Sequence, residues 1–550
     1  MRVAELLSAK SVMEPRKGVY IYDLGQEIAG IPVLTFHEKV GQRICIRYGE
    51  MLYPERERYK GLEGLLLQAN LREASNTDIY ICAGNDAEVY QPEFTFHGYR
   101  YIEITGVEHP PALSEVQSVL LSSVEKITGS FHCSDPLVNR FVENVKYSQY
   151  NNFISLPTDC PQRNERMGWL GDTHIFCKTA NLQSRVKIFY LRNLQAMRDM
   201  QTPDGRLPTI APFGGGFGGM TYESAMILVV WELYQMYDDT DLIQEYFPAM
   251  DTWMDAICRA GLPGKPQLYP LQWLGDWLAP DPTDEYLLFN AFHYRNARCM
   301  ERFCVLLGDK KNEEKYSRIA EETKAYWRQT FVDAETGKTK NIDGTICDVQ
   351  GSYAIALSCG VFGDEYKEKA FSHLARTTKE ADYTIRTGFF GTGPLNPILS
   401  EGGYSEIAQK TITQTKCPSW LYPVTQNATT MWERWDSYTA ENGFGENNAT
   451  NSFDHYSLGS VVSWLYENVL GIRRNEQHPG YKRFSLRPEI GTFSFAKGGI
   501  DTPHGRIESE WEQKDGQTLY RCRIPMNTSA ELVLGNRTIL LGSGTYQFVI

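Results

Sequence analysis

The sequence contains no stretch of eighteen consecutive apolar residues, which is the length that a membrane-spanning helix needs. Its first residues, Met1 to Ser8, lack the cationic segment and apolar run of a secretory signal peptide. The twelve cysteines are scattered from Cys45 to Cys522 without paired spacings, and no Cys-x-x-Cys occurs. Neither a disulfide framework nor a zinc site is therefore indicated. These absences predict a cytoplasmic protein with reduced thiols and no membrane association.

Positive charge is also scarce. The chain has 55 Lys and Arg against 68 Asp and Glu, a net charge of −13, and no basic stripe. This balance argues against nucleic acid or an anionic membrane surface as a partner. The ten histidines show no metal-ligand spacing, so we expect no cofactor and no catalytic metal. The expected partner is a small or neutral molecule. The many aromatic residues agree with a carbohydrate, although core packing explains most of them.

A chain of 550 residues is too long for one core. Short runs with period-two alternation predict an N-terminal antiparallel β-sandwich over residues 1–124. These runs are 19–23, 42–48, 78–82 and 99–104.

Helical spacing predicts a multi-helix domain over residues 125–472, and periodicity alone does not distinguish a closed toroid from an open solenoid. The expected helices are 137–147, 186–200, 225–237, 289–307 and 313–331. Strand and turn patterns return past Leu470 and predict a small C-terminal β-sandwich over residues 473–550.

The densest cluster of ionisable side chains is the segment 159–172, which reads Asp-Cys-Pro-Gln-Arg-Asn-Glu-Arg-Met-Gly-Trp-Leu-Gly-Asp. Pro161 and two glycines prevent a long regular helix there. Carboxylates supply general acids and acceptors for hydroxyl groups, arginines orient carboxylates, and an indole offers a face for a sugar ring. A solvated, salt-bridged loop is the alternative. The density of functional groups favours a site.

This segment resembles the signature of the bacterial α-L-rhamnosidases of glycoside hydrolase family 78, Asp-Cys-Pro-x-Arg-x-Glu-Arg-x-Gly-Trp-x-Gly-Asp. Every fixed position is present, and Asn164 stands where many relatives carry Asp. The likeness extends over nearly the whole chain from about Tyr20. It implies an (α/α)6 barrel with the sugar site in its mouth, flanked by N-terminal and C-terminal antiparallel β-sandwich domains. It also implies a short form that lacks the additional upstream β-domains of many relatives.

Glycoside hydrolysis requires two carboxyl groups, one on each side of the anomeric carbon. The segment Thr429-Thr-Met-Trp-Glu433 offers a distant second carboxylate among tryptophans, although a rim residue at a helix end is the alternative. The resemblance implies that Glu165 is the general acid and Glu433 the general base of an inverting reaction. Their carboxyl groups are then expected roughly 6.5 to 9.5 Å apart.

The resemblance also implies substrate contacts elsewhere. These fall at Asp159, Arg163, Trp169, Asp172, Tyr222, Asp276, Trp277, Trp432 and His455. For Asp172 the alternative is a capping or arginine-orienting carboxylate. For His455 the alternative is a core histidine whose ring is hydrogen-bonded to other protein groups.

One departure from the family pattern concerns Tyr222-Glu-Ser-Ala225, where relatives usually have Trp-Gly-Asp-Ala. A stacking surface is expected to survive at Tyr222, while Ser224 removes a charge for which Glu223 could compensate. The preceding glycine run, 214–219, has no Lys-Ser/Thr after it and is expected to be a mobile loop near the mouth rather than a phosphate loop.

Three functions follow from these patterns. The first is the release of terminal α-L-rhamnose from oligosaccharides or glycosides. The second is a related glycosidase acting on another α-linked sugar, and the third is a catalytically silent carbohydrate-binding protein. A homodimer is a further hypothesis.

Overall fold

The computed structural model describes residues 1–214, 216, 219–259, 274–446 and 448–549. The chain divides into two compact units. The first comprises Met1–Lys126, Glu143–Met167 and Pro423–Tyr456, and the second comprises Ile127–Val142, Gly168–Tyr422 and Ser457–Ile550. Residues 215, 217 and 218 of the glycine run lie outside the described residues.

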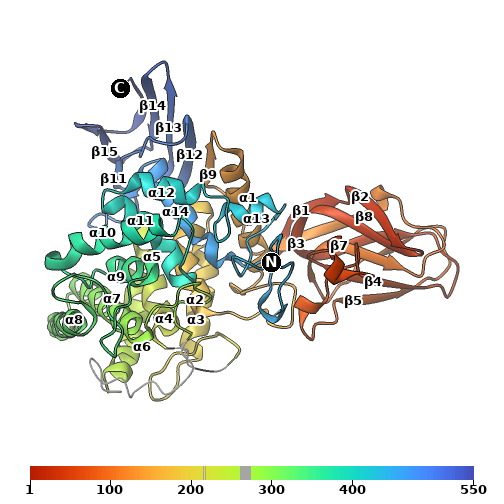
Figure 1. Ribbon diagram of the computed structural model, residues 1–550, viewed down its shortest axis with the longest axis horizontal. Coiled ribbons are helices and arrows are strands. Elements are labelled where there is room, and N and C mark those ends of the chain that lie inside the picture. Colours follow the sequence, from red (N-terminus) through yellow and green to blue (C-terminus); the bar gives the residue numbers. More distant parts are fainter. Residues whose placement is uncertain (215, 217–218, 260–273, 447, 550) are drawn as a thin grey trace. The chain divides into compact units, whose positions relative to one another are not determined.

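Eight strands form the N-terminal sheet of the first unit, in the order β1-β8-β3-β7-β4-β5, with β2 and β6 also paired to β3 (Figure 1). Their bounds are β1 Arg2–Ser8, β2 Ser11–Arg16, β3 Val19–Phe36, β4 Arg43–Gly49, β5 Thr77–Ile81, β6 Glu88–Tyr90, β7 His97–Thr105 and β8 Val116–Ser122.

Strand β3 continues well beyond the predicted 19–23. An irregularity between Asp23 and Ile28 lets the strand pair on with β7. Gly25 lies there at φ 72°, and its N–H donates to Asp23 Oδ1 at 2.6 Å. The interruption is therefore a bulge rather than the end of the strand.

The α-helices among the described residues begin after Cys133. They are α1 Pro136–Asn152, α2 Leu170–Gln183, α3 Lys187–Asp199, α4 Met220–Glu223, α5 Ala225–Tyr237, α6 Thr240–Arg259, α7 Glu285–Leu307, α8 Lys310–Phe331, α9 Gln350–Cys359, α10 Asp364–Glu380, α11 Phe389–Glu401, α12 Ser405–Ile412, α13 Leu421–Thr425 and α14 Val462–Trp464.

Local chemistry sets the ends of the two longest helices. Asp284 caps α7 by accepting from Leu287 N at 2.9 Å, and α7 ends at Gly308 in the left-handed region, φ 73°. Asp309 then caps α8 by accepting from Asn312 N at 3.1 Å. The resulting hairpin packs α7 against α8 (Figure 1).

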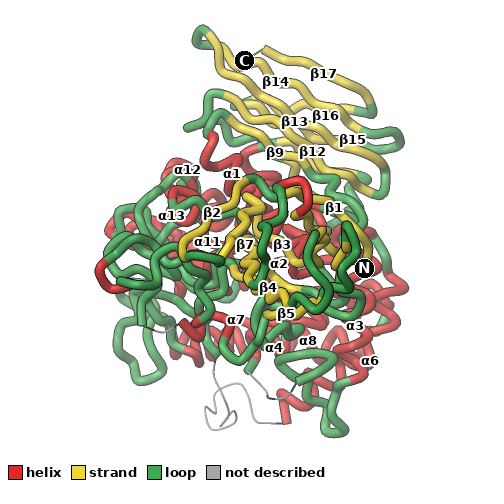
Figure 2. The backbone as a smooth tube through the Cα atoms, turned by 90° about the vertical axis from the view of Figure 1, so that its right-hand side faces the viewer, coloured by secondary structure: helices red, strands yellow, loops and turns green. Residues whose placement is uncertain are grey.

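Two sheets form the C-terminal part of the second unit, with orders β10-β11-β15-β16 and β17-β14-β13-β12-β9 (Figure 2). Strand β9 comes from the start of the helical region, which the sequence patterns did not predict. The bounds are β9 Ser130–Cys133, β10 Ile472–Arg474, β11 Arg483–Leu486, β12 Phe495–Thr502, β13 Gly505–Lys514, β14 Gln517–Ile524, β15 Ser529–Leu534, β16 Arg537–Leu541 and β17 Gly544–Val549.

The predicted order of an N-terminal sheet domain, a helical middle domain and a C-terminal sheet domain is confirmed. Among the described residues, no helix combines the length and apolar character required to cross a membrane.

Candidate active site

The motif segment 159–167 is a closed loop in the first unit. Asp159 N donates to Met167 O at 2.9 Å, and Met167 N donates to Asp159 Oδ1 at 2.7 Å. Between these ends, Arg166 adopts the left-handed conformation at φ 50°, which is uncommon for a residue with a side chain. Because its ends are tied together, this loop presents its charged side chains from a small piece of backbone.

Arg163 joins the two expected catalytic carboxylates. Its Nη2 contacts Glu165 Oε2 at 2.7 Å and its Nη1 contacts Glu433 Oε2 at 3.0 Å. The Arg163 side chain is only 1% exposed. Tertiary structure therefore brings Glu165 and Glu433, which are far apart in sequence, to adjacent nitrogens of one planar group.

Backbone contacts hold Glu433 in place. Glu433 N donates to Ser452 O at 2.9 Å, and Ser452 N donates to Glu433 Oε2 at 3.2 Å. Trp432 is 2% exposed and packs edge-to-face on Phe453. His455 is also buried, and its backbone N–H donates to Met431 O at 2.8 Å. Trp432 thus supports the Glu433 segment from the core and offers almost no open face.

Arg72 is a second cation on Glu165, and its sequence context did not identify it. Its Nη1 lies 2.9 Å from Glu165 Oε2, and its Nε donates to Ala449 O at 2.8 Å. Arg72 follows a short 3-10 turn, 69–71, and has a left-handed φ of 56°. Two guanidiniums, those of Arg72 and Arg163, therefore contact the same oxygen of Glu165.

Asp159 is fully buried beside these groups. Burial and the charge of Glu165 raise the pKa of Asp159 to about 8, while His455 and Arg163 act in the opposite direction. Arg163 Nη2 is 3.9 Å from Asp159 Oδ2, farther than from Glu165. The Cys160 thiol donates to the same Asp159 oxygen at 2.7 Å. Asp159 is therefore a proton-holding group near neutral pH.

Three further buried carboxyl groups, Glu27, Glu50 and Asp454, lie behind the Glu433 segment, and sequence analysis did not single them out. Glu50 accepts from Phe453 N at 2.9 Å, and Asp454 accepts from Asn151 Nδ2 at 2.6 Å. The adjacent peptide groups of 452 and 453 thus donate to Glu433 and Glu50 respectively. This network ties the strands of the N-terminal sheet to the segment that bears Glu433.

Burial dominates the protonation of these acids. It raises the pKa of Glu50 to about 8, with the charge of Asp454 as the next cause. It raises the pKa of Asp454 to about 7. Burial and the charge of Glu50 hold the pKa of Glu27 well above its usual range. Arg163, Arg100 and His455 oppose these shifts at Glu50, Glu27 and Asp454 respectively, but burial outweighs them.

The remaining predicted residues lie in the second unit, where Trp169, Gly171 and Tyr222 pack together. The Trp169 and Tyr222 rings meet edge-to-face at 5.9 Å. A Cβ at Gly171 would lie 2.5 Å from the Tyr222 ring, and one at Gly168 would lie 2.2 Å from Ala211 O. These close approaches explain both motif glycines. Tyr222 is only 3% exposed, and Trp169 is half-buried.

Asp172 lies in the first turn of α2 and is buried. Its Oδ1 accepts a hydrogen bond from the Ser457 hydroxyl. This contact orients the carboxylate within the second unit.

Ser224 and Glu223 are structural residues. Ser224 is fully buried, donates to Met220 O and accepts from Asn296 Nδ2 at 2.6 Å. Glu223 forms a bidentate ion pair with Arg206, at 2.9 and 2.5 Å. Because its carboxylate is committed to Arg206, Glu223 does not replace the charge that is absent at Ser224.

Asp276 holds the start of α11. Its Oδ1 accepts from Phe390 N at 2.8 Å and from Gly391 N at 3.0 Å, and its Oδ2 accepts from Gly388 N at 2.8 Å. Burial raises the pKa of Asp276 to about 6, and these N–H donors oppose the shift. The neighbouring Trp277 is half-buried and accepts from Phe389 N at 3.0 Å through its carbonyl.

Two groups of described residues bring three potential metal ligands within 4.8 Å of one another. One is exposed for the most part: Glu38, Glu108 and His109. The other is Asp159, Cys160 and Glu165. In the second group the guanidinium of Arg163 already lies 2.7 Å from Glu165, and a cation in that position competes with a metal ion.

Models of three known protein domains match consecutive parts of this chain. The profile of the bacterial alpha-L-rhamnosidase 6 hairpin glycosidase domain matches residues 126–469. Those of the concanavalin-like and C-terminal domains of bacterial alpha-L-rhamnosidases match residues 13–122 and 471–545.

Two similar proteins are both named alpha-L-rhamnosidase. An alpha-L-rhamnosidase of Streptomyces avermitilis is 33% identical over 97% of this chain and 50% of its own length. One from Formosa agariphila is 31% identical over 93% of this chain and 54% of its own length. The chain thus spans about half the length of these relatives.

A crystal structure of the Streptomyces avermitilis enzyme complexed with L-rhamnose superposes with a TM-score of 0.92 at 32% identity. The match covers 100% of this chain and 53% of that one.

Proposed function

Because this chain belongs to the bacterial alpha-L-rhamnosidase family, we propose that it is an inverting glycoside hydrolase that releases terminal α-L-rhamnose from oligosaccharides or glycosides. One observation carries the proposal: Arg163 contacts both Glu165 and Glu433. Glycoside hydrolysis requires two carboxyl groups at one site, and the contacts of Arg163 bring both of these together. A protein that only binds sugars has no need of this pair.

In the proposed reaction, Glu165 donates its proton to the glycosidic oxygen as the bond from that oxygen to C1 breaks. Glu433 removes a proton from a water molecule whose oxygen attacks C1 from the opposite face. The product sugar has the inverted configuration, Glu433 holds the proton taken from water, and Glu165 is left ionised because its proton has gone to the leaving hydroxyl. Proton exchange with solvent then restores both groups.

Glu165 must carry a proton to act as the acid, yet two arginines contact its carboxylate. We infer that substrate binding relaxes at least one of these contacts, so that the carboxyl gains a proton on becoming desolvated. Arg163 has an alternative partner in Glu433. Asp159 is 1% exposed, so we propose that it holds a proton beside Glu165 and supports the acid from the interior.

The other predicted contacts remain part of the proposal to different degrees. Trp169 and Trp277 retain partly exposed indoles that suit the apolar face of a sugar. Tyr222, Trp432, Asp172, Asp276 and His455 are buried. We expect those five to shape and support the residues that touch the sugar. The helices are proposed to close into an (α/α)6 barrel, consistent with the six-hairpin description of the matching domain.

Turnover of p-nitrophenyl α-L-rhamnoside tests this function directly. We expect hydrolysis by the wild type, release of the inverted anomer by NMR, and a loss of about 10²–10⁴-fold in Glu165→Gln and Glu433→Gln. Glu57→Gln, which alters an exposed carboxylate, is the matched control and should retain activity.

Other outcomes favour the alternatives. Hydrolysis confined to a different α-linked glycoside would identify a related glycosidase. Saturable sugar binding without hydrolysis over a broad glycoside panel would identify a silent binding protein. The homodimer and the cytoplasmic location remain predictions, and light scattering measures the oligomeric state.

A further inference from the structure

One face of helix α7 carries Arg295, Arg298 and Arg302. Their spacing of three and four residues places them on the same side of a helix. They line a hollow of about 390 Å³ in the second unit. The rest of its lining consists of Trp231, Cys299, Ser358, Cys359, Glu476 and Gln477.

Two of these three guanidiniums are not neutralised. Arg298 pairs with Glu301 at 2.6 Å. For Arg295 and Arg302, no carboxylate lies within 4.0 Å in the part of the chain that the structure describes. Both side chains are half-buried, so water compensates them less completely than it would at an open surface. Glu476, an acid of the lining, is exposed.

The adjoining cavity differs in charge. It has a volume of about 330 Å³ and shares Trp231, Arg295, Ser358 and Glu476 with the hollow. Its other cations are committed: Lys178 pairs with Glu467, and Arg474 pairs with Glu232 at 2.5 Å. Arg295 faces this cavity as well, and its charge helps to lower the pKa of Glu232. Arg302 lines the α7 hollow but not this cavity, and it has no carboxylate within 4.0 Å among the described residues.

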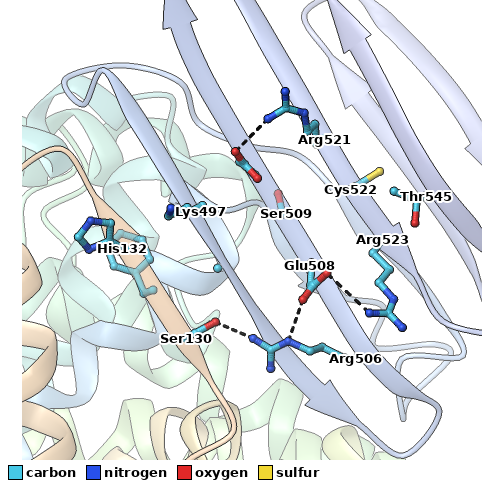
Figure 3. Close-up of a pocket in the computed structure, with 13 residues that line it drawn as sticks. Ser130, His132, Lys497, Arg506, Glu508, Ser509, Arg521, Cys522, Arg523 and Thr545 are labelled. Atoms are coloured by element: carbon cyan, nitrogen blue, oxygen red, sulfur yellow. Dashed lines mark hydrogen bonds and ion pairs between the residues drawn. The ribbon is translucent and has the colours of Figure 1, made fainter.

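A further hollow, over the five-stranded C-terminal sheet, also differs from the α7 hollow in how its arginines are paired (Figure 3). Its volume is about 420 Å³, and its arginines face carboxylates on the same or the neighbouring strand. Arg521 pairs with Glu510 at 3.2 Å, and Arg506 pairs with Glu508 at 3.1 Å (Figure 3). The arginines of this hollow are therefore paired with carboxylates, unlike Arg302 on α7.

We propose that the α7 hollow binds an elongated organic phosphate with two anionic groups, of the sugar bisphosphate class. Arg295 and Arg302 are two helical turns apart, about 10.5 Å along the axis, so one compact phosphate does not suit both positions as well as two linked phosphates do. Guanidinium forks bind phosphate oxygens in pairs. The half-buried indole of Trp231 offers a face for the ring between them.

Titration calorimetry of the full chain with fructose 1,6-bisphosphate, fructose 6-phosphate, fructose and inorganic phosphate tests the proposal. We expect one site for the bisphosphate, at least tenfold weaker binding of the monophosphate, and no binding of fructose. Arg295→Gln and Arg302→Gln should each reduce the affinity for the bisphosphate to that for the monophosphate. Arg318→Gln, an exposed arginine on α8, removes the same charge and should leave it unchanged.

Three results would overturn the site. These are equal affinity for the two phosphates, unaltered bisphosphate binding in both α7 variants, and displacement of the bisphosphate by L-rhamnose. Thermal unfolding of each variant verifies that it is folded. Because the readout is binding, the result is independent of whether the protein hydrolyses rhamnosides.

Discussion

Arg163 donates a hydrogen bond of 3.0 Å from Nη1 to Oε2 of Glu433, and both side chains are buried. The same guanidinium contacts Glu165 through Nη2 and Nε. A buried cation thus separates two carboxylates that would otherwise repel each other. Its planar, multi-donor geometry fixes where each of them points.

Replacing Arg163 by Lys should therefore abolish most activity even though the charge is retained. An ammonium is a single point of attachment and cannot hold two carboxylates on separate nitrogens. We expect kcat to fall at least tenfold in Arg163→Lys. Arg163→Gln should in addition cost about 3–5 kcal/mol of unfolding free energy, because a buried carboxylate loses its partner. Steady-state kinetics and denaturant unfolding measure the two effects. Wild-type kcat in the Lys variant would show that the bridge is dispensable.

The buried acid Glu50 predicts a pH dependence of stability. Its pKa is about 8 in the folded protein, against an ordinary value of 4.5. The folded state therefore binds more protons than the unfolded state between these values, and stability falls as pH rises through this interval. Asp454, with a pKa of about 7, contributes in the same direction, as do Glu27 and Asp159.

Thermal unfolding from pH 5.5 to 8.5 measures this slope. Glu50→Gln is neutral at every pH, so its melting temperature should fall less steeply than that of the wild type. The exposed control Glu57→Gln should reproduce the wild-type slope. A wild-type melting temperature that rises across this range would contradict the assignment of protons to the buried cluster.

Gly171 should tolerate no side chain. A methyl group there would lie 2.5 Å from the Tyr222 ring, so Gly171→Ala should cost about 1–3 kcal/mol through overpacking. At Gly542 a methyl group meets nothing within 4 Å, and Gly542→Ala should be nearly neutral. Combining Gly171→Ala with Tyr222→Leu should recover part of the loss. Denaturant unfolding of the wild type, the single variants Gly171→Ala, Tyr222→Leu and Gly542→Ala, and the double variant measures these effects, and purely additive losses would exclude a direct clash.

Asp276→Asn distinguishes a structural role from a sugar contact. The carboxylate accepts three backbone N–H groups at the start of α11, and an amide cannot accept all three because one end becomes a donor. We expect a loss of about 1–3 kcal/mol in stability with KM changed less than twofold. A large increase in KM at unchanged stability would instead make Asp276 a substrate ligand.

Several features of this protein could be read from the chain without coordinates. Period-two runs such as 42–48 and helical repeats such as 289–307 are local patterns, and they gave strands and helices close to β4 and α7. The segment around Glu165 could be predicted to be a functional site because it has many charged residues and is interrupted by proline and glycine. Turn chemistry and side-chain alternation act between near neighbours, which is why the sequence alone determines them.

Only the tertiary structure decided what those residues touch. Arg72 forms an ion pair with Glu165, and Glu50 accepts a hydrogen bond from the backbone N–H of Phe453. Asp276 accepts hydrogen bonds from backbone N–H groups at the start of α11. The hydrogen bond between buried Ser224 and Asn296 could not be predicted from the sequence either. Such contacts depend on how distant segments pack, and a buried charge gains its pKa and its partner from that packing rather than from its neighbours in the chain.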